Sequence, residues 1–359
     1  MRAIIDRVRR AAARRSAGRR TTDWRWLQQH AGAQLFAEPA AGDFEECGRI
    51  AEAYRPVLAR YAIAEQEFAD GSIKDHDAAA LHALVRARRP ETCYQVGTFV
   101  GYSAMILASA LKRNGHGRLV ACDPEVPHRS LMNPVDVARD AARELGLEDV
   151  ITFVRGWNAA TMGDGFSQSY LRRIPVVGRA TLEAMGPGLD FAFVDGDHSA
   201  AGTTCDLVLV QEFLKPDGVA VFHDVGSWPT VARALRSFLE DSFFYHAGGE
   251  VFFEYDTRDG ADGLVALRCK GKSCYPLLQI EIVSATDGNP VPRALVRVLQ
   301  TGFETITGTD GIAFHFGEVS ANAEVAVSAA GFRDYRAEAG MATNGDFRSI
   351  TIRLAPRDT

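Results

Sequence analysis

The sequence predicts an α/β fold: a doubly wound, mostly parallel sheet with helices on both faces, followed by a small all-β sandwich. Two observations carry this prediction. Between about residues 90 and 225, continuous apolar runs typical of buried parallel strands alternate with amphipathic helical patterns. After about residue 275, stretches of alternating polarity are separated by turn signals roughly every 8–12 residues, which is typical of a sandwich.

The expected elements follow in order along the chain. Helical spacing of apolar residues covers about residues 43–89, and Pro90 ends it. The expected strands are TCYQVG, RLVACD, VITFVRG, LDFAFVD and GVAVFHD, and the helices between and after them are YSAMILASALKR, PVDVARDAARELG, TTCDLVLVQEFL and SWPTVARALRSFLED. Two β-rich runs, near 243–256 and 263–269, complete this unit.

Three segments result from this pattern. Residues 1–40 form a basic N-terminal tail or helix, residues 41–271 the α/β domain, and residues 272–359 the sandwich. The stretch 157–188 is too long for a simple connection, and such insertions are often lids or binding loops. The arginine-rich N-terminus has apolar positions at helical spacing, so it is either an amphipathic helix with weak contact to an anionic membrane surface or a solvated tail.

Composition narrows the class of protein. The chain has 359 residues, 47% of them hydrophobic and 24% charged, with a formal net charge of −6. This balance argues against a nucleic-acid partner, which needs a basic surface. The six cysteines are scattered without a CxxC pair, which favours neither disulfides nor zinc and indicates a reducing, cytoplasmic compartment. No apolar run approaches the roughly 18–20 residues that cross a bilayer. We also expect a homo-oligomer.

A glycine loop follows the first expected strand. It reads VGTFVGYSA, with Gly97, Gly101 and Ser103 at the edge of the sheet. Residue 99 is Phe, so the G-x-G-x-x-G motif that holds a pyrophosphate is absent and NAD is disfavoured. The loop suits a cofactor without phosphate, and Asp123, after the second strand, is placed to accept hydrogen bonds from a ribose diol. Alternatively, the glycines and Asp123 are ordinary features of a doubly wound sheet.

Two acidic stretches, VDGDH at 194–198 and VFHDV at 221–225, end two further strands. Each delivers an aspartate with a histidine close by. They are either polar strand ends, a metal site, or an acid–base pair beside a cofactor. A carboxylate-bound cation lowers the pKa of a hydroxyl, and a histidine titrates near neutral pH and can act as a base.

The stretches YQVGTFVGYSAMILASAL, VACDP, LGLEDVITFVRG and DFAFVDGDHSAAGTTCDLVLVQEFLKPDGVAVFHD resemble the class I S-adenosylmethionine-dependent methyltransferases, which have a Rossmann-like fold. More narrowly, they are similar to the branch of small-molecule and sugar O-methyltransferases and cephalosporin-hydroxylase-like proteins. The resemblance covers about residues 90–225. It implies that Asp123 takes the ribose hydroxyls and that Asp195 lies near the methyl group. It implies cofactor contacts for these further residues: Gly97, Thr98, Gly101 and Ser103 on the methionine and ribose side, and Gly156, Trp157 and Asn158 near the adenine.

The same resemblance implies a divalent cation. The sugar methyltransferases bind it with one aspartate after the fourth strand and two adjacent acidic residues after the fifth. Here these positions hold Asp195, His223 and Asp224, so one acid is replaced by an imidazole, which admits Mn²⁺ or Zn²⁺ beside Mg²⁺. We expect these three residues to be the metal ligands. Alternatively His223 is a buried structural histidine or a base, and His198 is the better candidate for a base.

The C-terminal stretches TDGNPVPRALVRV, TGTDGIAFHF and VAVSAAGF resemble the transthyretin-like, carboxypeptidase-regulatory type of sandwich. Such modules usually stabilise, assemble or bind carbohydrate. The expected function is therefore an S-adenosylmethionine-dependent O-methyltransferase acting on a hydroxyl of a sugar, a glycan end or a polar natural product. The alternatives are a cephalosporin-hydroxylase-like, cation-dependent enzyme and a non-catalytic cofactor-binding scaffold.

Overall fold

The computed structural model describes these residues: 22–30, 38–127, 131–159, 174–240, 262–268, 277–300, 302–308, 310–316, 323–338, 342–344 and 347–357. It divides into two compact units, Met1–Ser273 and Cys274–Thr359. Three expectations lie outside the described residues: the basic stretch 1–20, the central part of the insertion (160–173), and the β-rich run near 243–256.

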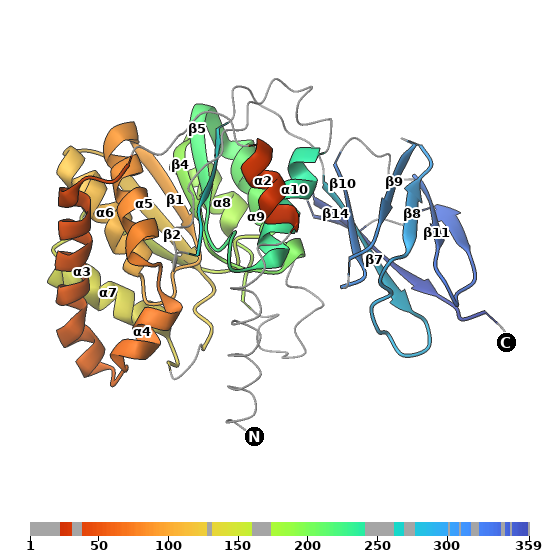
Figure 1. Ribbon diagram of the computed structural model, residues 1–359, viewed down its shortest axis with the longest axis horizontal. Helices are drawn as coiled ribbons and strands as arrows, with labels where there is room; N and C mark the ends of the chain where they lie inside the picture. Colours follow the sequence, from red (N-terminus) through yellow and green to blue (C-terminus); the bar gives the residue numbers. More distant parts are fainter. Residues whose placement is uncertain are drawn as a thin grey trace. The chain divides into compact units, whose positions relative to one another are not determined.

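The first unit is built on a six-stranded sheet with the order β3-β2-β1-β4-β5-β6 (Figure 1). The strands are β1 (Thr92–Val96), β2 (Arg118–Asp123), β3 (Ile151–Arg155), β4 (Leu189–Val194), β5 (Leu214–Phe222) and β6 (Val265–Arg268). The pairs among β1–β5 are parallel, and β6 is antiparallel to β5. The predicted, mostly parallel α/β sheet is confirmed.

Two groups of helices flank this sheet. The helices are α2 (Thr22–His30), α3 (Ala41–Arg60), α4 (Glu65–Gly71), α5 (Asp75–Arg88), α6 (Tyr102–Asn114), α7 (Pro134–Glu144), α8 (Gly178–Met185), α9 (Ala200–Phe213) and α10 (Pro229–Glu240). Helices α3, α5, α6 and α7 pack together, and α10 packs against α2 and α9. The two groups lie on opposite sides of the sheet (Figure 1). Because β1 lies between β2 and β4, the strand order reverses there, and ligands of such sheets bind beside this point.

The core of the first unit explains why α5 and α6 are so tightly held. Both helices are rich in alanine and leucine, and Ala78–Leu81 and Ala104–Leu107 are fully or almost fully buried. The small side chains allow close helix packing, and the leucines fill the space against the aromatic side chains of β4, Phe191 and Phe193. This packing fixes the start of α5 and of α6, both of which carry residues of the site described below.

The second unit contains two four-stranded sheets, β10-β7-β14-β13 and β12-β11-β8-β9. The strands are β7 (Leu277–Ser284), β8 (Leu295–Val298), β9 (Phe303–Ile306), β10 (Ile312–Phe316), β11 (Glu324–Ser328), β12 (Tyr335–Glu338), β13 (Ala342–Asn344) and β14 (Phe347–Leu354). Apolar residues from both sheets form one hydrophobic cluster, with Ile280 and Ile352 from the first sheet and Val296 and Val325 from the second. Within the described part of the chain, no helix has the length and hydrophobicity of a membrane span.

Candidate active site

The glycine loop lies between β1 and α6 and takes a conformation that favours glycine. Gly97 and Gly101 have φ of +80° and +83°, a region that side chains disfavour. A Cβ on Gly97 would lie 2.0 Å from the backbone oxygen of Asp195. Glycine at this position therefore lets the loop run against the end of β4. The loop expected to hold the cofactor and the acidic strand end are in direct contact.

Asp123 is the last residue of β2, and its side chain binds the backbone of this loop. One of its carboxylate oxygens accepts hydrogen bonds from the backbone N–H groups of Thr98 (2.7 Å) and Phe99 (3.2 Å), and the other from Glu125 (2.7 Å). Burial outweighs these bonds and raises the pKa of Asp123. Phe99 itself has a positive φ of 51°. The carboxylate is thus fixed at the edge where the ribose was expected.

Ser103 and Gln95 support the same loop from the sheet. The side-chain amide of Gln95 donates to the backbone oxygen of Gly97 (2.7 Å) and to the hydroxyl of Ser103 (3.0 Å). Both side chains are buried. Ser103 therefore lies in the first turn of α6 as part of the loop's support. Gln95 had not been singled out from the sequence because a buried strand residue gives no signal of its partner.

The segment after β3, residues 156–158, is the part expected to contact the adenine of the cofactor. The backbone N–H of Gly156 donates to the backbone oxygen of Asp123 (2.9 Å), and Trp157 forms an isolated parallel bridge with Val176. Asn158 is buried between Tyr94, whose hydroxyl donates to its Oδ1 (2.7 Å), and Asp206, which accepts from its Nδ2 (2.8 Å).

Asp206 is the ionisable member of that buried network. Burial raises its pKa to about 7, although the hydrogen bond from Asn158 opposes this shift. The carboxyl group therefore releases its proton near neutral pH, directly beneath the segment expected to contact adenine.

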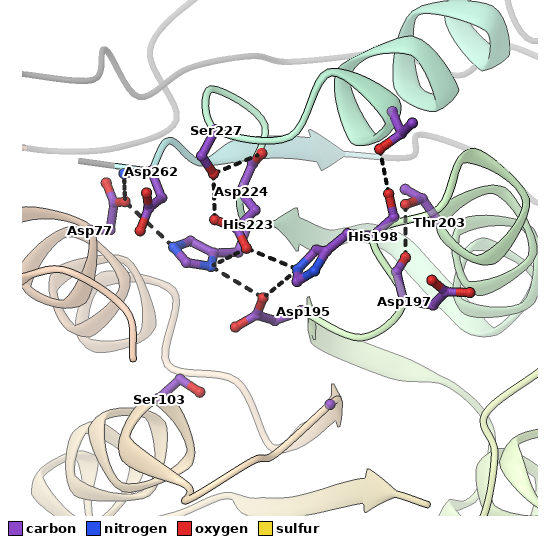
Figure 2. Close-up of polar contacts among 12 residues, drawn as sticks. Asp77, Ser103, Asp195, Asp197, His198, Thr203, His223, Asp224, Ser227 and Asp262 are labelled. Atoms are coloured by element: carbon purple, nitrogen blue, oxygen red, sulfur yellow. Dashed lines mark hydrogen bonds and ion pairs between the residues drawn. The ribbon is translucent and has the colours of Figure 1, made fainter. Parts of the chain in front are cut away.

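The two acidic stretches meet at the neighbouring ends of β4 and β5 (Figure 2). We call Asp195, His198, His223 and Asp224 the acidic cluster. Asp195 Oδ1 lies 3.2 Å from His223 Nδ1 and 3.4 Å from His198 Nε2. Asp224 Oδ2 lies 2.9 Å from His198 Nε2 and 3.9 Å from His223 Nδ1. Each imidazole thus bridges both carboxylates.

The charges within this cluster stabilise one another. Burial would lower the pKa of His198, but its hydrogen bonds to Asp195 and Asp224 outweigh burial and raise the pKa to about 10. Burial likewise opposes protonation of His223, yet the same carboxylates raise its pKa well above the usual value. In turn, burial opposes ionisation of Asp195 and Asp224, but the charge of His223 and the hydrogen bonds from His198 together outweigh it and lower the pKa of both carboxyl groups. Without another cation, the two imidazoles are the counter-charges of the two carboxylates.

Asp224 is held in a strained backbone conformation. Its φ of +61° lies in the left-handed region, which costs on the order of 1 kcal/mol for a residue with a side chain. Its Oδ1 accepts from the Ser227 hydroxyl (2.6 Å), and its backbone oxygen accepts from the Trp228 N–H (2.8 Å). These bonds at the turn before α10 fix the carboxylate toward His198.

Trp228 covers the outer side of the cluster. Its ring stacks on His198 with centroids 4.9 Å apart and an interplanar angle of 12°. About half of its surface (48%) is exposed. An exposed aromatic surface next to a charged cluster is a natural platform for the apolar face of a small ligand.

Two carboxylates close to the cluster were missed by sequence reasoning. Asp77, in the first turn of α5, is fully buried, and one of its oxygens lies 3.5 Å from His223 Nε2. Asp262, just before β6, forms a group with His223 and Asp224 in which one donor atom of each lies within 4.8 Å of the others. Burial, followed by the charge of Asp224, raises the pKa of Asp262 to about 6.

The spacing of donor atoms fits a small divalent cation. Ligands about 2.0–2.2 Å from such an ion lie about 3.0–3.5 Å from one another in tetrahedral or octahedral geometry. The contacts between carboxylate and imidazole atoms in the acidic cluster span 2.9 to 3.9 Å. Among the described residues, two groups have donor atoms within 4.8 Å of one another, Asp195 with His198 and Asp224, and His223 with Asp224 and Asp262, so the expected ligand set is divided between them. The expected base therefore stands among the expected ligands, not apart from them.

Comparison with protein families gives one match. Residues 94–225 match the family described as "Methyltransferase domain". This range starts in β1 and ends directly after the acidic cluster, so it includes the glycine loop, Asp123 and all four cluster residues. A search of curated proteins found no match.

Several solved structures are similar to part of this chain. The methyltransferase PaMTH1 of Podospora anserina, bound to SAH, is 16% identical, with 62% of this chain and 87% of that chain covered and a TM-score of 0.42. The O-methyltransferase of Bacillus cereus, also with SAH, is 16% identical, with coverages of 64% and 92% and a TM-score of 0.42. TomG of Streptomyces achromogenes, involved in tomaymycin synthesis and bound to SAM, is 19% identical, with coverages of 69% and 95% and a TM-score of 0.42.

Likeness at this level says nothing of the acceptor. The matched domain contains the glycine loop, the acid after β2 and the acidic cluster. The chain contains a methyltransferase domain and is an S-adenosylmethionine-dependent methyltransferase.

Proposed function

We propose that this chain transfers the methyl group of S-adenosylmethionine to a hydroxyl oxygen of a sugar, a glycan end or a polar natural product. The proposal rests on the contact between the two halves of the site: the cofactor half, which contains the glycine loop and Asp123, and the acidic cluster. Because Gly97 runs directly against the backbone of Asp195, a cofactor on the glycine loop meets the acidic cluster at its edge. An acceptor hydroxyl between them is in line for transfer.

The chemistry of the step explains why an acidic cluster is needed. An electron pair of the acceptor oxygen forms the new O–CH₃ bond, the S–CH₃ bond breaks, and the sulfur leaves as a neutral thioether. The donor is already activated, whereas an aliphatic hydroxyl is a weak nucleophile that must lose its proton. The acidic cluster supplies the polar groups that can accept this proton or orient the hydroxyl.

The proposal includes a divalent cation, Mg²⁺ or Mn²⁺, held by Asp195, His223 and Asp224 with His198 as a further donor. Such a cation, when bound, lowers the pKa of a coordinated hydroxyl. The group formed by Asp195, His198 and Asp224, with one donor atom of each within 4.8 Å of the others, supports it. To bind a cation, the two imidazoles must release protons that the carboxylates hold firmly, so cation affinity should rise with pH. Without a cation, His198 is the candidate base; because its pKa is raised to about 10, it must first lose its own proton, so transfer should rise with pH.

The acceptor class rests on two features. The exposed ring of Trp228 lies beside His198. Such a ring can stack on the apolar face of a sugar or on an aromatic ring of a polar natural product. We further propose that the two four-stranded sheets of the second unit pack as a sandwich and contribute to binding or assembly, because one hydrophobic cluster draws on both sheets.

A label-transfer screen tests this function. The full chain is incubated with methyl-labelled S-adenosylmethionine and a panel of glycosides and glycan ends, with added Mn²⁺, with added Mg²⁺, and with chelator. We expect transfer to at least one hydroxyl-bearing acceptor that is weakened by chelator. Asp197→Asn is a control variant that should keep wild-type transfer, because Asp197 lies in the same loop but accepts hydrogen bonds from Ser199, the N-cap of α9, instead of facing the cluster. Transfer only to amines or thiols would contradict the proposal.

A further inference from the structure

Tyr54 is a buried residue of α3 that reaches the glycine loop from outside the sheet. It is fully buried, and its hydroxyl donates a hydrogen bond to the backbone oxygen of Val100 in the loop (3.0 Å). Val100 is itself buried. Among the described residues, no other hydrogen bond reaches this oxygen. Because a buried carbonyl without a donor is costly, the hydroxyl of Tyr54 supplies a partner that the loop needs.

The same hydroxyl lies close to Gly101, the next residue of the loop. A Cβ on Gly101 would lie 3.5 Å from the hydroxyl oxygen of Tyr54 and 2.4 Å from the Cβ of Ala138 in α7. Helix α3 packs against α7 and also contacts α6, which begins directly after the loop (Figure 1). The C-terminal end of the glycine loop is therefore enclosed by α3 and α7.

Aromatic packing fixes the ring of Tyr54 in this place. Its centroid lies 5.0 Å from that of Phe68 in α4 and 5.8 Å from that of Tyr102 in α6. The rings of Phe68 and Tyr102 also contact each other, with centroids 5.4 Å apart. Aromatic rings in such edge and tilted contacts hold one another in place. Removal of the hydroxyl alone should therefore leave the ring of Tyr54 where it is.

The contact from α3 completes the set of bonds that hold the glycine loop. Asp123 and Gln95, from β2 and β1, bind the N-terminal part of the loop. Tyr54 binds its C-terminal part at Val100. Asp123 and Gln95 lie within residues 94–225, which match the methyltransferase domain, whereas α3 lies before that range. A helix outside the matched domain thus takes part in shaping the loop expected to hold the cofactor.

We propose that Tyr54 is a positioning residue for the cofactor, and that its hydroxyl keeps the glycine loop in the conformation that binds S-adenosylmethionine. The proposal rests on the proposed function in one respect, since that function places the cofactor on this loop. In the simpler interpretation, the hydroxyl only joins α3 to its neighbours, and the affinity for the cofactor does not depend on it.

The variants Tyr54→Phe and Tyr102→Phe separate the two interpretations. Each removes one buried hydroxyl from the same aromatic cluster and keeps its ring. The hydroxyl of Tyr102 donates to the backbone oxygen of Cys47 in α3 (3.1 Å), so it also joins α3 to its neighbours. Its removal leaves the bond to Val100 intact. Tyr102→Phe is therefore the matched control for a purely structural role.

The test is calorimetric titration of the full chain with S-adenosylmethionine, with circular dichroism to show that each variant is folded. We expect Tyr54→Phe to weaken binding by about 3–10-fold, the size of one buried hydrogen bond. We expect Tyr102→Phe to bind as the wild type does. Wild-type affinity in Tyr54→Phe would overturn the proposal. An equal loss in both variants would also overturn it, because that is the result of a purely structural role.

Hydrogen exchange of the chain without cofactor gives a second readout. In Tyr54→Phe we expect the backbone amides of residues 97–101 to exchange faster than in the wild type, because the loop opens more easily. We expect no such change in Tyr102→Phe. Unchanged exchange in Tyr54→Phe would contradict the positioning role. If the wild type does not bind S-adenosylmethionine, the proposed function falls, while hydrogen exchange still decides whether Tyr54 holds the loop.

Discussion

The two halves of the candidate site neutralise their carboxylates in different ways. On the β2 side, Asp123 is held by three backbone N–H groups, from Thr98, Phe99 and Glu125. On the β4–β5 side, Asp195 and Asp224 are held by two imidazoles. Backbone amides keep their protons, whereas imidazoles exchange them. The carboxylate of Asp123 is therefore held by donors that do not titrate, whereas those of the acidic cluster are held by groups that can gain or lose a proton.

The halves nevertheless share one backbone contact, and breaking it should have the largest effect. Gly97→Ala places a methyl group 2.0 Å from the backbone oxygen of Asp195 and also strains a left-handed residue. We expect a loss of about 2–4 kcal/mol in the free energy of unfolding and loss of S-adenosylmethionine binding. Urea unfolding and calorimetric titration measure both.

Gly115→Ala is the control for that prediction. Gly115 has a similar φ of +76°, but a Cβ there would meet nothing within 4 Å. We expect a loss of only about 1 kcal/mol, from backbone strain alone. Equal losses in the two variants would mean that the contact between the loop and Asp195 is not tight.

The buried Asp206 should make the free energy of unfolding depend on pH. Its pKa is raised to about 7 by burial. Between about pH 4 and pH 7 the folded state therefore holds a proton that the unfolded state has released, so stability falls as pH rises through this window. Asp206→Asn removes that fall. Between pH 5 and pH 7 we expect the variant to gain about 2 kcal/mol relative to the wild type, at about 1.4 kcal/mol per pH unit. Parallel stability curves for the two proteins would contradict this.

The smallest effect is expected on the acceptor side. Trp228→Ala removes the exposed ring that stacks on His198. An aromatic stacking contact of about 0.5–1.5 kcal/mol corresponds to a rise of about 3–10-fold in the KM for the acceptor. S-adenosylmethionine affinity should not change, and Trp228→Phe should keep most of the effect of the ring. If Trp228→Ala changes the affinity for S-adenosylmethionine but not the KM for the acceptor, Trp228 contacts the cofactor and not the acceptor, which would contradict this prediction.

The sheet could be predicted from the sequence because each strand is a short apolar run between helical patterns. The residues at strand ends were also predictable, since parallel strands bring their carboxyl ends to one edge: Asp195 and Asp224 meet as that rule requires. Helix α8, inside the insertion, was not predicted because it is only eight residues long and lies in a stretch that was interpreted as a lid or binding loop.

What sequence reasoning missed are contacts between distant segments. Asp77 and Asp262 are 185 residues apart in the chain and meet only because α5 packs beside the end of β6. Likewise, nothing in Tyr94, Asn158 and Asp206 taken singly indicates that they form one buried network. His198 was expected to be the base. Its place between two carboxylates depends on the loop conformation after β4, which no local pattern encodes.

The division of labour between the two halves is tested most directly by comparing Asp123→Asn with Asp224→Asn. Affinity for S-adenosylmethionine is measured by calorimetry, and label transfer to an acceptor from the screen is measured with added Mn²⁺. We expect Asp123→Asn to weaken cofactor binding by about 10-fold, because a charged hydrogen-bond acceptor becomes neutral. We expect Asp224→Asn to bind the cofactor as the wild type does and to lose at least about 100-fold in transfer. Full transfer by Asp224→Asn, with or without chelator, would contradict the account.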